Sequence, residues 1–185
     1  AAPRWQNPSI DMVTVRALYN DKEIAFLLEW DDPFKDVIHK PEMELDPAPL
    51  TGTAAYSSYA GAQNVVPGQL ETFRDSVAIQ FPVKNPEGAK KPYFFRGDSS
   101  NPVNLWLLKA DLEEAGQPSI EDSNAAGYRQ GIKAQLPESL NVKGKGVWKD
   151  GVWRVVMKRP LKTEDKNDVQ FEKGKFVPFS LNAWD

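Results

Sequence analysis

Short apolar runs separated by turn residues recur along the chain, and this pattern is typical of β-strands. The runs are rich in β-branched and aromatic residues and cover 10–18, 23–30, 75–81, 103–108, 146–148, 152–157 and 176–182. Helical patterns are weak because 15 prolines and 12 glycines interrupt most windows, so only short helical turns are expected, near 68–75 and 109–116. The sequence therefore predicts an all-β fold, an antiparallel β-sandwich with long loops and few short helices.

Two tight turns and a set of tryptophans give this prediction detail. Residues 19–22 are expected to join the first two strands, and Asp150-Gly151 carries the signal of a tight β-hairpin between 146–148 and 152–157. Tryptophans that belong to strand-like runs are expected to be buried in the core. These are Trp30, Trp106, Trp153 and Trp184.

Two stretches read as long connections rather than strands. Residues 39–70 contain several prolines and a tract of small residues, and a second connection runs from about 113 to 142. Loops of such length are usually functional or mobile. Because no internal repeat or domain boundary is visible, residues 1–185 are expected to form a single domain.

Composition narrows the possible partners. The formal net charge of −3, with acidic and basic residues interspersed, offers no basic patch for phosphates, so no nucleic acid partner is expected. No apolar run approaches the roughly 18 residues of a membrane span. The chain has no cysteine, so a cofactor would be held without a covalent bond. Its first residues, Ala1-Ala2-Pro3, suit a processed mature end, and we expect an exported protein.

The residues that could carry chemistry are few. With one histidine and no G-x-S-x-G motif, hydrolase chemistry is disfavoured. The acidic residues at 31–32 and 42–46 lack the spacing of a calcium loop and are interpreted as solvated loop acids. His39 and Met43 lie four positions apart, and both residue types ligate haem iron, although a lone histidine near a proline is more often a surface residue.

Six strings along the chain resemble one protein family. They are VRALYND (15–21), IAFLLEWDDP (24–33), DSVAIQFP (75–82), GD through PVNLW (97–106), KDGVWRVV (149–156), and VPF through AWD (177–185). In order and in coverage they are similar to the haem-binding γ subunit of ethylbenzene dehydrogenase and its relatives in dimethyl sulfide dehydrogenase, selenate reductase and chlorate reductase. The 39–70 excursion lies outside the resemblance.

The resemblance implies a β-sandwich, similar in shape to carbohydrate-binding modules, that holds one haem b. It implies a non-catalytic, periplasmic electron-transfer subunit beside an iron–sulfur β subunit and a molybdenum α subunit. Its haem exchanges electrons with the iron–sulfur chain and a soluble carrier. A methionine and a lysine ligate the iron, which leaves no open position for a substrate.

The chain departs from the family at both ligand positions. Arg96 stands where the family methionine is expected, and the family lysine would follow Asp185. Three explanations stay open: Met43 or His39 ligates the iron, a lysine lies beyond Asp185, or haem has been lost. Arg96 then suits a haem propionate, with Lys109 as a second candidate for that pairing.

Two other functions stay open, a carbohydrate-binding module and a haem-less structural subunit, and lysines near the C-terminus are a further possible source of an iron ligand. A carbohydrate-binding module would use exposed Trp or Tyr faces on the same fold, and a haem-less subunit would have a structural role. If the 39–70 excursion supplies no ligand, Lys173 and Lys175 near the C-terminal strands are the next candidates.

Overall fold

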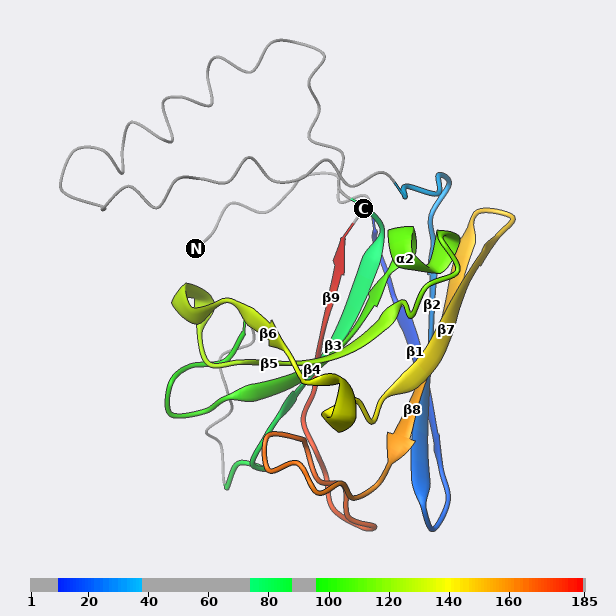
Figure 1. The fold of residues 1–185 in the computed structure, drawn as a ribbon. Coiled ribbons are helices and arrows are strands. Elements are labelled where there is room, and N and C mark those ends of the chain that lie inside the picture. Colours follow the sequence, from blue (N-terminus) through cyan, green and yellow to red (C-terminus); the bar gives the residue numbers. More distant parts are fainter. Residues whose placement is uncertain (1–9, 38–73, 88–95, 185) are drawn as a thin grey trace, which may run out of the picture.

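The structure is a computed structural model that describes residues 10–37, 74–87 and 96–184, and over them the chain forms two antiparallel sheets packed face to face (Figure 1). This confirms the predicted all-β sandwich. The first sheet has the order β1-β2-β8-β7. Its strands are β1 (Thr14–Tyr19), β2 (Glu23–Asp31), β7 (Lys143–Lys149) and β8 (Val152–Pro160).

The second sheet has the order β6-β5-β4-β3-β9. Its strands are β3 (Ser76–Pro82), β4 (Val103–Lys109), β5 (Ile120–Ala125), β6 (Ile132–Ala134) and β9 (Ser180–Trp184). The helical elements are short: α2 (Ala110–Glu114) and the 3-10 turns Tyr128–Gln130 and Pro137–Ser139. The α2 helix matches the helical turn predicted near 109–116. The turn predicted near 68–75 falls mostly outside the described residues, and Asp75 directly precedes β3.

Two of the sequence expectations about strands are corrected. The stretch 113–142 is not a plain connection, because it contains β5 and β6. The β5 sequence IEDSNA is largely polar, and it forms a strand because its backbone pairs with β4. Asp122 accepts a hydrogen bond from Asn104, and Glu121 forms an ion pair with Lys109. In the run 176–182 only the end is strand, since β9 begins at Ser180. The 39–70 excursion lies outside the described residues.

The core lies between the two sheets and is dominated by aromatic rings. Trp30 and Trp153 stack with ring centroids 5.9 Å apart, and Trp106 packs against Phe26 and Phe81. Burying one such side chain contributes roughly 1.5–3 kcal/mol. Trp30, Trp106 and Trp153 are buried as predicted, whereas Trp184 at the end of β9 is only partly buried.

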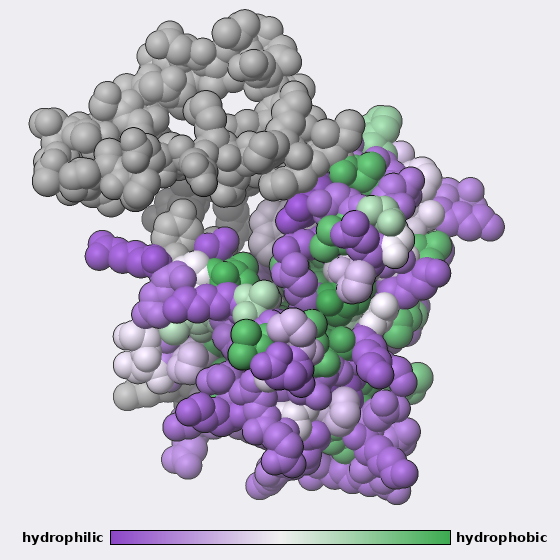
Figure 2. Space-filling view, in the orientation of Figure 1, coloured by the Kyte–Doolittle hydropathy of each residue, from purple (hydrophilic) through white to green (hydrophobic). Residues whose placement is uncertain are grey.

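The described surface is mostly hydrophilic in the view of Figure 2, where hydrophobic side chains occur in small scattered groups. Among the described residues no helix has the length and apolar character needed to cross a membrane.

The hairpin between β7 and β8 has the predicted tight turn. Asp150 and Gly151 have φ angles of 54° and 75°, the left-handed pair that a type I′ turn requires. This conformation joins the strands in a register in which Trp148 faces Trp153.

Replacing Gly151 with Val should lower the free energy of unfolding by about 1–2 kcal/mol, because a β-branched residue resists positive φ. The nearest atom to an added Cβ is the Asp32 carbonyl oxygen at 3.7 Å, so the cost is conformational rather than a clash. Urea unfolding followed by tryptophan fluorescence measures the change. Lys149→Val, in the same hairpin but outside the turn, is the control. Equal losses in both variants would contradict this account of the turn.

Candidate functional site

The second sheet is buried on both sides at β3 and β4. Val77, Ile79 and Phe81 face the core between the sheets. The alternate side chains of β3, β4 and β5 point to the other side of the sheet, and they are also buried. This side, called here the outer face, comprises Ala78, Gln80, Val103, Leu105, Leu107, Ser123 and Ala125. Val103, Leu105 and Ala125 form an apolar cluster of their own, separate from the main core.

Position 96, where the resemblance expects the methionine ligand, lies against this outer face. The Arg96 backbone N–H donates a hydrogen bond to Gln80 Oε1 at 2.9 Å, and the Arg96 carbonyl accepts one from Gly127 N–H at 2.8 Å. Arg96 and Gly97 both have a φ of 63°. A Cβ on Gly97 would lie 2.5 Å from the Asn101 carbonyl oxygen, so glycine is required there. The Arg96-Gly97 turn is therefore held at a fixed place beside β3.

The row of outer-face residues nearest position 96 contains an unpaired polar group. Gln80, Leu105 and Ser123 lie in register across β3, β4 and β5. The Ser123 hydroxyl is buried and has no hydrogen-bond partner among the described residues. Buried polar groups are normally paired, so this hydroxyl marks the place where a polar group of a ligand would be accommodated.

Lys109 lies on the same outer face, at its opposite end. It pairs with Ser76 across β3 and β4, four strand positions from the pair Gln80–Leu105, which corresponds to about 13 Å. Its ammonium forms an ion pair with Glu121. Trp184 also pairs with Ser76, from β9. The structure thus brings Arg96, Lys109 and the end of β9 to one side of one sheet.

The candidate iron ligands His39 and Met43 lie outside the described residues. Among the outer-face residues named above, none is a methionine or histidine, and a guanidinium such as that of Arg96 is a hydrogen-bond donor without an acceptor atom for iron. The described residues also contain no cluster of three or more His, Cys, Asp or Glu that could hold a metal ion.

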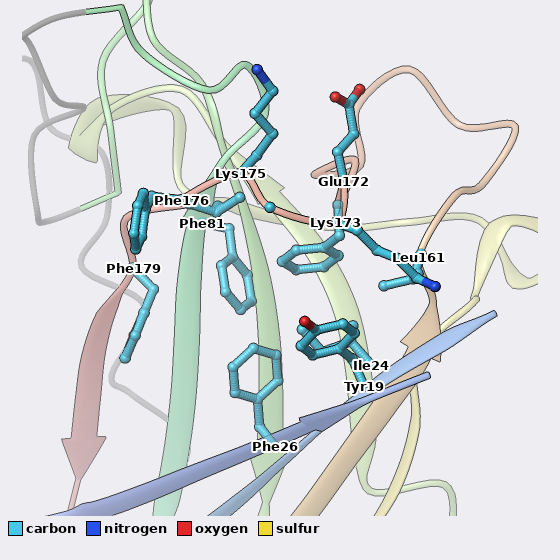
Figure 3. A pocket seen from close by; sticks show the side chains of 13 residues that line it. Tyr19, Ile24, Phe26, Phe81, Leu161, Glu172, Lys173, Lys175, Phe176 and Phe179 are labelled. Atoms are coloured by element: carbon cyan, nitrogen blue, oxygen red, sulfur yellow. The ribbon is translucent and has the colours of Figure 1, made fainter. Parts of the chain in front are cut away.

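An apolar pocket of about 330 Å³ opens at one end of the sandwich, on the inner side of β3 (Figure 3). Phe26, Phe81 and Phe179 point into it, and the segment 171–179 supplies much of its rim. Lys173 and Lys175, the C-terminal lysines considered as ligands, line this pocket and not the outer face. The sequence pattern does not indicate this pocket, because most of its rim belongs to a segment without regular structure.

Next to the pocket lies a buried charged cluster of Arg159, Asp122 and Asp168, which was not predicted from the sequence. The Arg159 guanidinium donates to Asn104 Oδ1 at 3.1 Å, approaches Asp168 at 3.3 Å, and lies over the Trp106 ring at 5.1 Å from its centroid. Asp122 lies 4.0 Å from the same guanidinium and accepts a hydrogen bond from Asn104 Nδ2 at 2.6 Å. The alternation of β8 was the available signal, since Arg159 follows Trp153, Val155 and Met157 on the core side.

This cluster holds two carboxylates against one guanidinium. Burial raises the pKa of Asp122 to about 7, and the charge of Asp168 adds to the effect, while the hydrogen bond from Asn104 and the charge of Arg159 oppose it. Burial lowers the pKa of Arg159, and the attraction of Asp168 and Asp122 counters that change. Near neutral pH the cluster therefore exchanges a proton at Asp122.

The contribution of Asp122 to the free energy of unfolding should decrease as the pH rises from about 4 to about 7. In that range folded Asp122 keeps a proton that the unfolded chain, titrating near the ordinary value of 3.8, has released. The contribution is fully present below about pH 4 and is lost once the pH passes 7. Thermal unfolding between pH 4 and 8 should show a flatter profile for Asp122→Asn. Asp31→Asn, at an exposed position of β2, should keep the wild-type slope. Identical slopes in wild type and Asp122→Asn would contradict this assignment.

The match to a known protein family includes the residues of the outer face. The family model described as ethylbenzene dehydrogenase matches residues 6–135. The chain belongs to the ethylbenzene dehydrogenase family. The matched residues include β1 to β6, and so both position 96 and most of the outer face, whereas the pocket rim at 171–179 lies beyond them.

Two curated relatives of this family member carry informative names. The chain is 30% identical over 114 residues, 62% of this chain and 37% of the relative, to a protein of Haloferax mediterranei named as a respiratory nitrate reductase heme subunit. It is 29% identical over 123 residues, 66% of this chain and 46% of the relative, to the chlorate reductase subunit gamma of Ideonella dechloratans. Each match covers less than half of the relative's length.

Proposed function

We propose that this member of the ethylbenzene dehydrogenase family is the haem-carrying subunit of an oxidoreductase complex, and that it transfers electrons without catalysing a substrate reaction itself. The names of the two relatives, a heme subunit and a gamma subunit of two reductases, support this. The proposed partners are an iron–sulfur β subunit, a molybdenum α subunit and a soluble electron carrier. The proposed location is the periplasm. The haem is proposed to be of b type, since this sequence contains no cysteine for thioether attachment.

The observation that carries the proposal is the outer face of the second sheet. A haem needs an apolar surface for its ring and polar partners for its two carboxylates. The outer face combines the buried cluster of Val103, Leu105 and Ala125 with the unpaired hydroxyl of Ser123. It lies within the part of the chain that the family model matches.

The two ends of the outer face carry different polar side chains that could bind the haem carboxylates. Both propionates of a haem extend from the same edge of the ring. In a bound haem they would therefore lie at one end of the outer face and not at the other. Lys109, at one end, forms an ion pair with Glu121. At the other end, Gln80 and the Ser123 hydroxyl lie in one row beside Arg96, and this is the proposed propionate end. Arg96 would there bind a carboxylate, at the position where the resemblance implies an iron ligand.

When bound, the haem supplies a one-electron redox couple. The outer face would exclude water from the ring, and Arg96 and Ser123 would orient the carboxylates. Gln80 and Gly127 hold the 96–97 turn in place. Met43 and His39 remain the proposed axial candidates, with a lysine after Asp185 as the alternative.

A haem-less structural subunit is the second candidate function. Arg96 itself favours it, because a guanidinium at the position of the expected methionine removes one iron ligand.

Absorption spectroscopy tests the proposed function and the role of Arg96 together. The purified chain, titrated with haem, should bind one haem with a sharp Soret band that shifts on reduction with dithionite. Arg96→Gln should weaken haem binding tenfold or more, because a charge-assisted hydrogen bond contributes about 1.5–3 kcal/mol. Lys109→Gln should have a smaller effect, since Lys109 lies at the opposite end of the outer face from the proposed propionate end.

Arg154→Gln is the matched control, because Arg154 is exposed on β8 in the other sheet. Circular dichroism confirms that each variant is folded. A colourless chain that binds no haem but copurifies with an oxidoreductase would support the structural subunit instead. Equal weakening in Arg96→Gln and Arg154→Gln would contradict the proposed role of Arg96.

A further inference from the structure

The apolar pocket at the end of the sandwich has aromatic rings that the described chain leaves largely or partly exposed. Phe176 is 93% exposed, Tyr19 65% and Phe179 48%, and all three line the pocket. Large apolar side chains that gather around an open pocket, rather than occurring singly, indicate a binding site. The pocket is on the inner side of β3, and the outer face is on the opposite side, so the two sites are separate.

The floor of the pocket restricts its ligand to an apolar group. Phe26, Phe81 and Phe171 lie within 6.5 Å of one another by ring centroids, and aliphatic side chains complete the wall. The charged side chains that line the pocket, Glu172, Lys173 and Lys175, extend to its edge (Figure 3). Sugar hydroxyls would find no partners on such a floor, and leaving them unpaired would cost free energy. The pocket therefore does not suit a carbohydrate.

The charged side chains at the mouth of the pocket determine which charge a polar group of the ligand can carry. Lys173 forms an ion pair with Asp21. Glu172 accepts a hydrogen bond from Lys162 at 3.0 Å, and this contact, with the nearby charge of Lys175, holds the pKa of Glu172 below its ordinary value. Within the described ranges Lys175 makes no ion pair. Lys175 is thus the cation at the mouth that can receive an anionic group.

We propose that this pocket binds a small amphiphilic anion, an alkyl or aryl carboxylate, with its apolar part among Phe26, Phe81 and Phe179 and its carboxylate at Lys175. The volume of about 330 Å³ lies at the lower end of the range of small-molecule sites. A carboxylate on a medium-length alkyl chain or a single ring system matches both the floor and the mouth. The proposal does not depend on haem binding.

Isothermal titration calorimetry with octanoate and octanol tests this inference. The two probes share the alkyl chain and differ in charge. Wild type should bind octanoate more tightly than octanol by tenfold or more. Lys175→Glu should abolish that preference and leave the affinity for octanol unchanged. Phe176→Ser should weaken the binding of both probes without unfolding the domain, since Phe176 is almost fully exposed.

Two controls and one haem experiment complete the test. Phe34→Ser and Lys145→Glu, at exposed positions outside the pocket, should bind both probes like wild type. Octanoate affinity should be the same with and without bound haem. Absence of octanoate binding, or an unchanged preference in Lys175→Glu, would overturn the inference. Loss of octanoate binding when haem is added would also overturn it, because the pocket would then be the haem site.

Discussion

Side chains of β3 and β4 are buried on both faces, and this constraint decides where the other elements and the candidate sites lie. One face needs the first sheet as a cover, which brings Trp30, Trp153 and Phe26 against Trp106 and Phe81. The other face carries its own apolar cluster. A strand pair in a two-layer sandwich ordinarily leaves one face to water. Here the chain itself also covers the second face, since its side chains are buried.

The buried charged cluster has a different part in the structure. Arg159 joins β8 to β4 through Asn104, to β5 through Asp122, and to the segment after β8 through Asp168. Desolvation makes such clusters weak contributors to stability, and breaking one costs more than forming it gains. Their value lies in fixing one arrangement of the chain. Here the fixed segment runs on to Phe171, whose ring lies 5.6 Å from the Arg159 guanidinium carbon and lines the pocket.

The sequence predicted the parts of this fold that local pattern determines. Short runs rich in β-branched and aromatic residues located β1, β2, β3, β4, β7 and β8, and Asp150-Gly151 located the hairpin turn, because each signal is contained in a few neighbouring residues. The β5 strand was missed because its polar residues become buried only through partners far along the chain, such as Arg159 for Asp122. Trp184 was expected to be buried, yet its side chain points to the outer side of the edge strand β9.

For the candidate site too, local sequence patterns predict some features, while others depend on contacts between distant parts of the chain. Arg96 and Lys109 were named from the sequence, but only the pairing of β3 with β4 reveals that both belong to one face and lie at its opposite ends. The unpaired Ser123 hydroxyl could not be predicted, since it depends on which face of β5 is buried. The end pocket needed the path of the 171–179 segment, which has no periodic pattern before β9.

Methyl NMR of the haem-loaded chain tests the proposal that haem lies on the outer face of the second sheet. Paramagnetic ferric haem broadens nearby resonances, and zinc protoporphyrin gives the diamagnetic reference. The methyl signals of Val103 and Leu105 should broaden with ferric haem, while those of Leu28 and Val155 in the central core should be much less affected. Broadening of Ile24, Leu161 and Val177 in the end pocket, with Val103 and Leu105 unchanged, would contradict it.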